Sequence, residues 1–244
     1  MKILLAPSET KIAGGVGAFD ISSLLFDKLT SKRVKLLHTY TNILQRDDNI
    51  AISKMFGLKK PTEIERYKRD IIYEPTLKAI KRYTGVAFEY LSYSTLNSSA
   101  KEYIDTNVII FSNLFGAISA SDYIPDYRLK QGESVGDIKV DRFYKEELST
   151  LMDSYLKGEE ILDLRATFYD KFYKPSLPYT TLKFLKDGKV VSHWAKAYRG
   201  LVLRELAISN IDSLDEFIKM PIEGLGVEEI ITKKLQSQII YSIN

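Results

Sequence analysis

The chain has 244 residues, of which 45% are hydrophobic and 27% are charged, a balance typical of a soluble globular protein. It contains no cysteine, which excludes disulfides, thiolate metal sites and cysteine nucleophiles, and its formal net charge is only +3. The short apolar run at the N-terminus is not typical of a signal peptide, and no apolar stretch has the length of a membrane span. We therefore expect a cytoplasmic protein with no membrane partner.

The N-terminal half is predicted to begin with a buried strand and to continue with helices. Residues 3–6 form a short apolar run that ends at Pro7, and the glycines within 14–17 indicate a flexible loop. Apolar residues at helical spacing follow, and Pro61 and Pro75 each fit the first turn of a helix. These patterns predict helices at residues 31–45, 62–72 and 74–85.

The middle of the chain is predicted to supply two more buried strands. Residues 107–112 and 160–164 are rich in Ile, Val and Leu, which is typical of strands covered on both faces. A helix predicted at 141–157 lies between them, and this strand-helix-strand order favours parallel pairing.

The C-terminal part is predicted to contain a hairpin followed by helices. Asp187-Gly188 separates two apolar runs, at 180–186 and 189–194, and is a strong hairpin signal. Helices are predicted at residues 195–209, 213–219 and 227–236. The sequence thus predicts a mixed α/β fold with a partly parallel central sheet and an antiparallel hairpin, in a single compact domain spanning 1–244.

Basic charge is concentrated in one stretch of the sequence. Residues 165–204 contain nine lysines and arginines against two aspartates, a net of +7, whereas residues 205–244 carry a net of −4. Aromatic residues are interleaved with these charges. A solvated basic face and a surface that contacts phosphates both fit this pattern.

Polar side chains follow the ends of the three predicted strands. Ser8 and Lys11 come after the first strand, Ser112 after the second, and Arg165 after the third. Ligands of open α/β sheets bind beyond the carboxyl ends of the strands, so these side chains are candidates for one site. Loop capping and turn formation are the alternative roles for each of them.

The helix predicted at 195–209 places Lys196, Arg199 and Gly200 on one face. A glycine within a helix costs about 1 kcal/mol relative to alanine, which indicates the close approach of another group. That group is either a phosphate or a packed neighbouring segment.

Metal and cofactor sites are not indicated by the sequence. The two histidines, His38 and His193, are far apart in the sequence and have no partner at ligand spacing, so we expect no metal and no cofactor.

Two segments show a weak resemblance to a helix-hairpin-helix. Residues 220–227 contain glycines between two predicted helices but have acidic surroundings, and residues 43–57 are more basic but contain no glycine hairpin.

Five short segments, in this order, resemble the YaaA family of bacterial peroxide-stress proteins. They are Ala-Pro-Ser-Glu-Thr-Lys at 6–11, Tyr-Thr-Gly at 83–85, Phe-Ser-Asn-Leu-Phe-Gly at 111–116, Asp-Tyr-Arg-Leu at 126–129 and Lys-Ala-Tyr-Arg-Gly at 196–200. A sixth segment, Ile-Leu-Asp-Leu-Arg at 161–165, supports the same resemblance. The resemblance implies a compact α/β fold with a positively charged cleft and a helix-hairpin-helix near 43–54. It also implies DNA binding and a role in surviving hydrogen peroxide by limiting free iron and DNA damage.

Matching these motifs, together with the strand ends and the basic stretch, assigns twelve residues to a DNA- or anion-binding cleft. They are Ser8, Lys11, Tyr83, Gly85, Ser112, Gly116, Tyr127, Arg128, Arg165, Lys196, Arg199 and Gly200. The expected partners are DNA, bound through its backbone without sequence preference, and a small anionic ligand, with the protein acting as a monomer.

Two other interpretations stay open at this point. An enzyme acting on a nucleotide or nucleobase would use Ser8, Lys11, Tyr127 and Lys196, although the sequence assigns no acid or base among them. An iron-binding protein would have to rely on carboxylates, because cysteine is absent and histidine is scarce.

Overall fold

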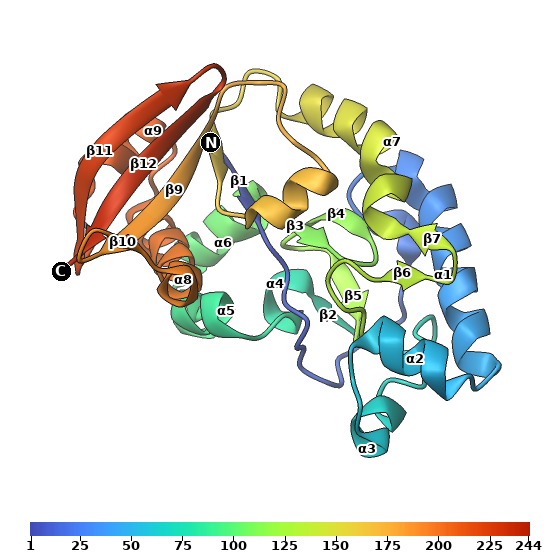
Figure 1. The fold of residues 1–244 in the computed structure, drawn as a ribbon. Coiled ribbons are helices and arrows are strands. Elements are labelled where there is room, and N and C mark those ends of the chain that lie inside the picture. The colour runs from blue at the N-terminus through green and yellow to red at the C-terminus, as the bar shows by residue number, and fades with distance from the viewer.

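A computed structural model describes the backbone of residues 1–244 and every side chain except those of Ser192 and His193. The expectation for His193 therefore lies outside the described side chains. Figure 1 shows a long twisted sheet with helices packed around it. The sheet has eight strands in the order β11-β12-β9-β8-β1-β3-β4, with β10 paired to β9, and two small two-stranded sheets, β2-β5 and β6-β7, lie outside it.

The strands are short in the first half of the chain and longer in the second. They are β1 (Lys2–Leu5), β2 (Thr76–Lys78), β3 (Val108–Ser112), β4 (Gly116–Ser119), β5 (Tyr123–Pro125), β6 (Ser134–Val135), β7 (Ile138–Lys139), β8 (Ile161–Asp163), β9 (Tyr179–Lys186), β10 (Lys189–Val190), β11 (Leu225–Lys233) and β12 (Gln236–Ile243).

Three helices have sixteen or more residues, and the others are shorter. They are α1 (Thr30–Gln45), α2 (Asn49–Phe56), α3 (Pro61–Glu65), α4 (Ala79–Arg82), α5 (Val86–Leu91), α6 (Ser98–Asn107), α7 (Val140–Tyr155), α8 (Ser192–Ser209) and α9 (Leu214–Lys219). Four single turns of 3₁₀ helix complete the structure: η1 (Ile21–Ser23), η2 (Asp27–Leu29), η3 (Tyr93–Thr95) and η4 (Thr167–Lys171).

The middle of the sheet is parallel because its strands are apolar on both faces. Ile3 of β1 pairs with Val108 of β3 on one side and with Leu162 of β8 on the other, both in parallel register, and all three side chains are buried. β9 continues the parallel run, whereas β4 and β11 are antiparallel at the two ends. The prediction of a mixed α/β fold with a partly parallel sheet is therefore confirmed, while the single-domain boundary stays a prediction.

The Asp187-Gly188 hairpin is also confirmed. Both residues have positive φ, 51° and 71°, as a two-residue hairpin turn requires, and they join β9 to β10. The second strand is shorter than predicted because α8 begins at Ser192, three residues earlier than the sequence pattern indicates.

Several predicted helices are wrong. Residues 227–236 lie mostly in β11, where β-branched Val, Ile and Thr side chains fit a strand that pairs with β12. Consequently 220–227 does not connect two helices and is not a helix-hairpin-helix. The helix predicted at 62–72 ends at Glu65, and 74–85 contains the strand β2 before α4, because Thr76 pairs with Pro125 of β5.

The helices cover the sheet in two groups, which Figure 1 separates clearly. α8 packs against α5, α6 and β9, while α7 packs against β4, and α1 packs against α2 and β6. The carboxyl ends of β1 and β8 are thereby enclosed between the α5-α8 pair and the segment that follows β8.

Candidate functional site

A cavity of about 390 Å³ lies at the carboxyl ends of β1 and β8. Leu5 ends β1, and Leu164 follows β8, and both side chains border the cavity. The connection from β1 leads to β3 on one side, whereas β8 and β9 lie on the other side of β1. The cavity is therefore at the point where the strand order reverses, which is where open α/β sheets bind their ligands.

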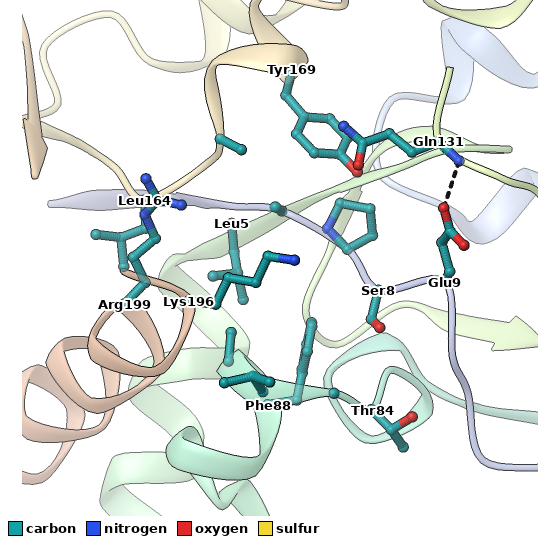
Figure 2. A pocket seen from close by; sticks show the side chains of 16 residues that line it. Leu5, Ser8, Glu9, Thr84, Phe88, Gln131, Leu164, Tyr169, Lys196 and Arg199 are labelled. Carbon is teal, nitrogen blue, oxygen red and sulfur yellow. Dashed lines mark hydrogen bonds between the residues drawn. The ribbon is translucent and has the colours of Figure 1, made fainter. Parts of the chain in front are cut away.

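Five segments far apart in the sequence form its walls. The loop after β1 contributes Ser8 and Glu9, residues 84–88 come from the start of α5, and the segment after β8 contributes Ala166 and Tyr169. The loop after β5 contributes Gln131, and α8 contributes Lys196 and Arg199. Figure 2 shows the Lys196 side chain pointing into the middle of the cavity, between Tyr169 and Phe88.

The loop after β1 is held in place by pairing with the segment before α5. Lys11 and Tyr83 form an antiparallel bridge, and the Thr84 amide donates to the Thr10 carbonyl at 3.1 Å. Gly85 has a φ of 104°, and a Cβ there would lie 2.9 Å from the Ser8 hydroxyl oxygen. Glycine thus allows the Ser8 side chain to approach the start of α5.

Lys11 lies behind this loop instead of in the cavity, and it is only 5% exposed. Its Nζ donates to the carbonyls of Ser8 and Glu9 at 3.2 and 3.3 Å and lies 3.9 Å from the centre of the Tyr127 ring. Burial lowers the pKa of this amine to about 7, and the carboxylates of Asp126 and Glu9 oppose that shift.

A chain of hydroxyl groups continues from Lys11 toward the sheet. The Tyr83 and Tyr127 hydroxyls are 2.9 Å apart, and the Tyr127 hydroxyl lies 2.7 Å from that of Ser112. Ser112 also accepts from the amides of Leu114 and Phe115, so it caps the turn after β3. Burial raises the pKa of both tyrosines, so both are neutral hydrogen-bonding groups at neutral pH.

Arg128 anchors the same loop from the other side. Its guanidinium donates to the Glu9 carboxylate at 2.8 Å, to the Glu9 carbonyl at 3.1 Å and to the Phe56 carbonyl at 2.9 Å. The Glu9 carboxylate also accepts a hydrogen bond from the backbone amide of Gln131 at 2.9 Å, which the dashed line in Figure 2 marks. Arg128 therefore positions the cavity wall and does not offer its charge to a ligand.

Lys196 and Arg199 supply the positive charge of the cavity. Lys196 is exposed and Arg199 is half-buried. Among the side chains that the structure describes, neither takes part in an ion pair. Burial lowers the pKa of Arg199, and only the neighbouring Asp163 counters this, although Asp163 is already bound by Arg165. Both cations are thus available to an anion.

Comparison with known proteins decides the family. Residues 1–230 match the family described as peroxide stress protein YaaA. The chain belongs to the YaaA family. It is 41% identical over 244 residues to an uncharacterized protein of Campylobacter jejuni, covering 100% of this chain and 99% of that protein. UPF0246 proteins of Corynebacterium efficiens and Corynebacterium glutamicum are 36% and 33% identical, covering 86% and 94% of this chain and 86% and 95% of theirs.

The twelve residues that the YaaA resemblance and the sequence pattern assigned to the cleft separate into three groups. Ser8, Gly85, Lys196 and Arg199 border the cavity, and Lys11, Tyr83, Ser112, Tyr127 and Arg128 form the buried support behind its loop. Gly116, Arg165 and Gly200 are packing or ion-pair residues outside its lining.

Arg165, the first of the packing group, forms a bidentate pair with Asp163 at 2.8 and 2.6 Å and stacks on Phe111. Gly116 lies against the Tyr144 ring with a φ of 73°, and Gly200 lies against the Ala87 carbonyl. The close approach that the mid-helix glycine indicates is therefore a neighbouring backbone and not a phosphate.

Tyr169, Gln131, Thr84 and Phe88 border the cavity but were not assigned from the sequence. Tyr169 belongs to the aromatic residues interleaved with the basic stretch, and Thr84 lies within one of the family motifs, so both carried a weak signal. Gln131 and Phe88 carried none, because each lies just outside the family motif that precedes it, at 126–129 and 83–85.

A second basic surface of this YaaA-family chain lies at α2 and α3. These helices are joined by Gly57 and three further residues, and Gly57 has a φ of 65° that ends α2. A groove of about 580 Å³ between the helices is bordered by Lys54, Lys59 and Lys68, of which Lys68 is paired with Asp47 and Glu65. The glycine turn between helices thus lies at 57–60, whereas the turn at 46–48 between α1 and α2 contains no glycine.

The described part of the chain offers neither a metal cluster nor a membrane helix. No group of three or more His, Cys, Asp or Glu side chains is placed there to hold a metal ion. No described helix is long and apolar enough to span a membrane.

Proposed function

We propose that this protein acts in the cytoplasm during peroxide stress by binding DNA through the phosphate backbone. The observation that carries the proposal is the pair of cations, Lys196 and Arg199, on the cavity side of α8 with no ion-pair partner among the described side chains. Two unpaired cations on one wall of a cavity favour the binding of an anion there. DNA is the polyanion that fits a peroxide-stress protein, because DNA is damaged by peroxide and iron.

The α2-α3 pair is the second part of the proposed DNA surface. A glycine turn between two short helices is the geometry of a helix-hairpin-helix, and the Ser53 hydroxyl donates to the Leu58 carbonyl to hold the turn. Lys54 and Lys59 are exposed there and form no ion pair with any described side chain. Such lysines would contact phosphates without reading the bases.

The two basic surfaces are connected through the loop after β1. Arg128 joins Glu9 of that loop to the last residue of α2, Phe56. Arg66, just after α3, donates to the Lys11 carbonyl at 3.0 Å and pairs with Asp126. A DNA molecule that contacts the hairpin would therefore be held in a defined position relative to the cavity.

Protection against peroxide would follow from DNA binding in two ways. Bound protein shields DNA from hydroxyl radicals, and limiting free iron would reduce their formation. We propose both effects for this chain. A deletion strain complemented with wild-type or DNA-binding-deficient protein would test them, with free ferrous iron and DNA strand breaks measured after peroxide treatment; equal protection by both proteins would contradict the link to DNA binding.

The direct test removes the two cavity cations. Lys196→Ala/Arg199→Ala should remain folded, because neither side chain forms an ion pair with a described residue, and should bind a duplex at least tenfold more weakly at low salt. Lys186→Ala/Lys189→Ala is the matched control, since it removes the same charge from the exposed β9-β10 turn. Equal affinities for wild type and the cavity variant would show that DNA binds elsewhere.

The hairpin is tested separately with Lys54→Ala/Lys59→Ala. This variant should also weaken duplex binding, and the loss should be similar for duplexes of unrelated sequence because phosphate contacts carry no sequence information. Lys28→Ala/Lys35→Ala, which removes two exposed lysines from the α1 region, serves as the control. Unchanged affinity for the hairpin variant would remove α2-α3 from the proposed DNA surface.

A further inference from the structure

We infer that the cavity between β1, β8, α5 and α8 is a binding site for a single nucleotide, with its phosphate at Lys196 and Arg199 and its base beside Tyr169 and Phe88. This inference deepens the proposed function, because the nucleotide is either one extruded from bound DNA or a free nucleoside monophosphate. The chemistry of the ligand is the same in both cases.

The size and position of the cavity favour one small ligand. A volume of about 390 Å³ lies within the range of roughly 300–1,000 Å³ that small-molecule sites occupy. The cavity is at the strand-order reversal beside β1 and β8, where α/β sheets bind nucleotides and similar ligands. A duplex could contact the exposed Lys196 but is too wide to fill a space of this size, so duplex contacts alone do not account for the cavity.

The positive charge of the cavity is confined to one wall. Lys196 and Arg199 are one turn apart on α8, and Figure 2 shows the lysine pointing into the cavity and the arginine lying beside Leu164. The Glu9 carboxylate on the opposite side already accepts hydrogen bonds from Arg128 and from the backbone amide of Gln131. Arg199 loses hydration on burial, which lowers its pKa, and it gains no ion pair among the described residues. An anion at this wall would therefore be stabilised.

The remaining surface suits a flat apolar group. Leu5, Pro7, Leu164 and the rings of Tyr169 and Phe88 border the cavity. The Tyr169 ring is fixed because its hydroxyl donates to Asn113 at 3.1 Å and its edge packs against Phe168. A fixed aromatic ring is a suitable stacking surface for a base.

Polar groups beside the rings would contact the edge of the base or the sugar. Ser8, Thr84 and the exposed Gln131 also border the cavity, and their side chains carry two hydroxyls and an amide. These groups offer both donors and acceptors, as the edge of a base requires. A phosphate alone would use the cationic wall and leave this half of the cavity unused.

The inference is tested first with small probes. We expect at least one of dAMP, dGMP, dCMP and dTMP to bind at least tenfold more tightly in calorimetry than inorganic phosphate or the matching deoxynucleoside. Ala166→Phe, which fills the cavity without changing its charge, should abolish this binding, and so should Lys196→Glu at an exposed position. Lys186→Ala/Lys189→Ala should bind as wild type does.

Two results would overturn the nucleotide site. One is binding of inorganic phosphate as tight as that of every nucleotide, which would show an anion site only. The other is unchanged nucleotide binding by Lys196→Glu, whose folding is checked by circular dichroism, because the phosphate would then lie elsewhere. Lys196→Glu keeps the test decisive if Ala166→Phe does not fold.

The two sources of the nucleotide are separated with a duplex that carries 2-aminopurine opposite an abasic site. Extrusion into the cavity should change the fluorescence on binding to wild type and not to Ala166→Phe, whereas an unchanged signal would assign the cavity to free nucleotides. Failure of DNA binding is distinguishable, because Lys54→Ala/Lys59→Ala should lose duplex affinity and keep its affinity for the mononucleotide.

Discussion

Lys11 shows how a single buried cation organises the candidate site. Its amine bridges two carbonyls of the loop after β1 and stands over the Tyr127 ring, so it holds the loop against the sheet. The cost is desolvation, which lowers the pKa of this amine from 10.5 to about 7. The charge of Lys11 therefore depends on pH in the neutral range, unlike that of an exposed lysine.

This pKa predicts a specific pH dependence of stability. Between pH 7 and 10.5 the unfolded chain holds a proton on this amine that the folded chain has lost, so raising the pH favours the folded state. The free energy of unfolding is greatest near and above pH 10.5, the pKa of this amine in the unfolded chain. It falls as the pH drops toward about 7, the pKa of the amine in the folded chain. Relative to Lys11→Met, the wild-type free energy of unfolding should rise by up to about 1.4 kcal/mol per pH unit across this range.

Urea denaturation at several pH values between 7 and 9.5 measures the effect. Lys186→Met, at an exposed position, provides the control and should follow the wild-type pH dependence. If the free energy of unfolding changes with pH in the same way for wild type and Lys11→Met, the Lys11 amine keeps its proton in the folded protein. Its contacts would then compensate for the lost hydration.

At the scale of elements, the contact between α5 and α8 forms the base of the cavity. Both helices border the cavity, and they approach closely because Gly200 has no side chain. A Cβ on Gly200 would lie 2.0 Å from the Ala87 carbonyl oxygen, so the helices would have to separate to accept it. The position of Lys196 and Arg199 relative to the loop after β1 depends on this contact.

Gly200→Ala should therefore destabilise the protein, although alanine is the better helix former. The gain in helix propensity is about 1 kcal/mol, and overpacking of a close contact costs typically about 1–3 kcal/mol or more. We expect a net loss of up to about 2 kcal/mol in urea denaturation, together with weaker DNA binding. Gly226→Ala, on the strand β11, is the control, because it also has an ordinary φ but would meet only side-chain atoms, of Ser242 at 3.2 Å and of Asn244 at 3.8 Å. A Gly200→Ala protein as stable as wild type would show that α5 and α8 are not held at this distance.

At the scale of the whole molecule, basic residues that are adjacent in the sequence have different roles in the structure. Of the stretch 165–204, Arg165 is bound to Asp163, and Arg204 donates to the carbonyls of Leu91 and Ser92. Lys186 and Lys189 lie on the distant β9-β10 turn. The net charge of +7 therefore overstates the charge available at the cavity, where α8 provides two cations.

The proposed DNA binding should depend on salt in proportion to the number of phosphates that the protein neutralises. Log affinity should fall linearly with log salt for duplexes of unrelated sequence, with a slope of about −0.9 for each neutralised phosphate. Lys54→Ala/Lys59→Ala should make the slope less steep by about 0.9 for each phosphate that the variant leaves without a lysine. Fluorescence anisotropy between low and moderate salt measures both quantities, and salt-independent or sequence-selective binding would contradict a backbone-mediated mode.

The sequence by itself determined the parallel centre of the fold and the positions of its polar strand ends. Apolar runs at β1, β3 and β8 require cover on both faces, and Asp187-Gly188 requires a tight turn, because these are local constraints on solvation and backbone conformation. The YaaA family was also determined at this level, since its motifs survive as short ordered segments. β11 was not, because its charged and β-branched residues occur in pairs without alternation, and such a run fits either a helix or a strand until β12 lies beside it.

Only the tertiary structure decided which polar residues face a ligand. Ser8 and Lys11 are three residues apart, yet Ser8 borders the cavity and Lys11 is buried behind it, where it bridges Tyr83 and its amine donates to the Ser8 and Glu9 carbonyls. Arg128 and Arg165 are bound by Glu9 and Asp163, whereas Lys196 and Arg199 are paired with no described side chain. The sequence contains the charges, but whether a charge is satisfied depends on neighbours brought together from distant segments, and that is set only when the chain packs.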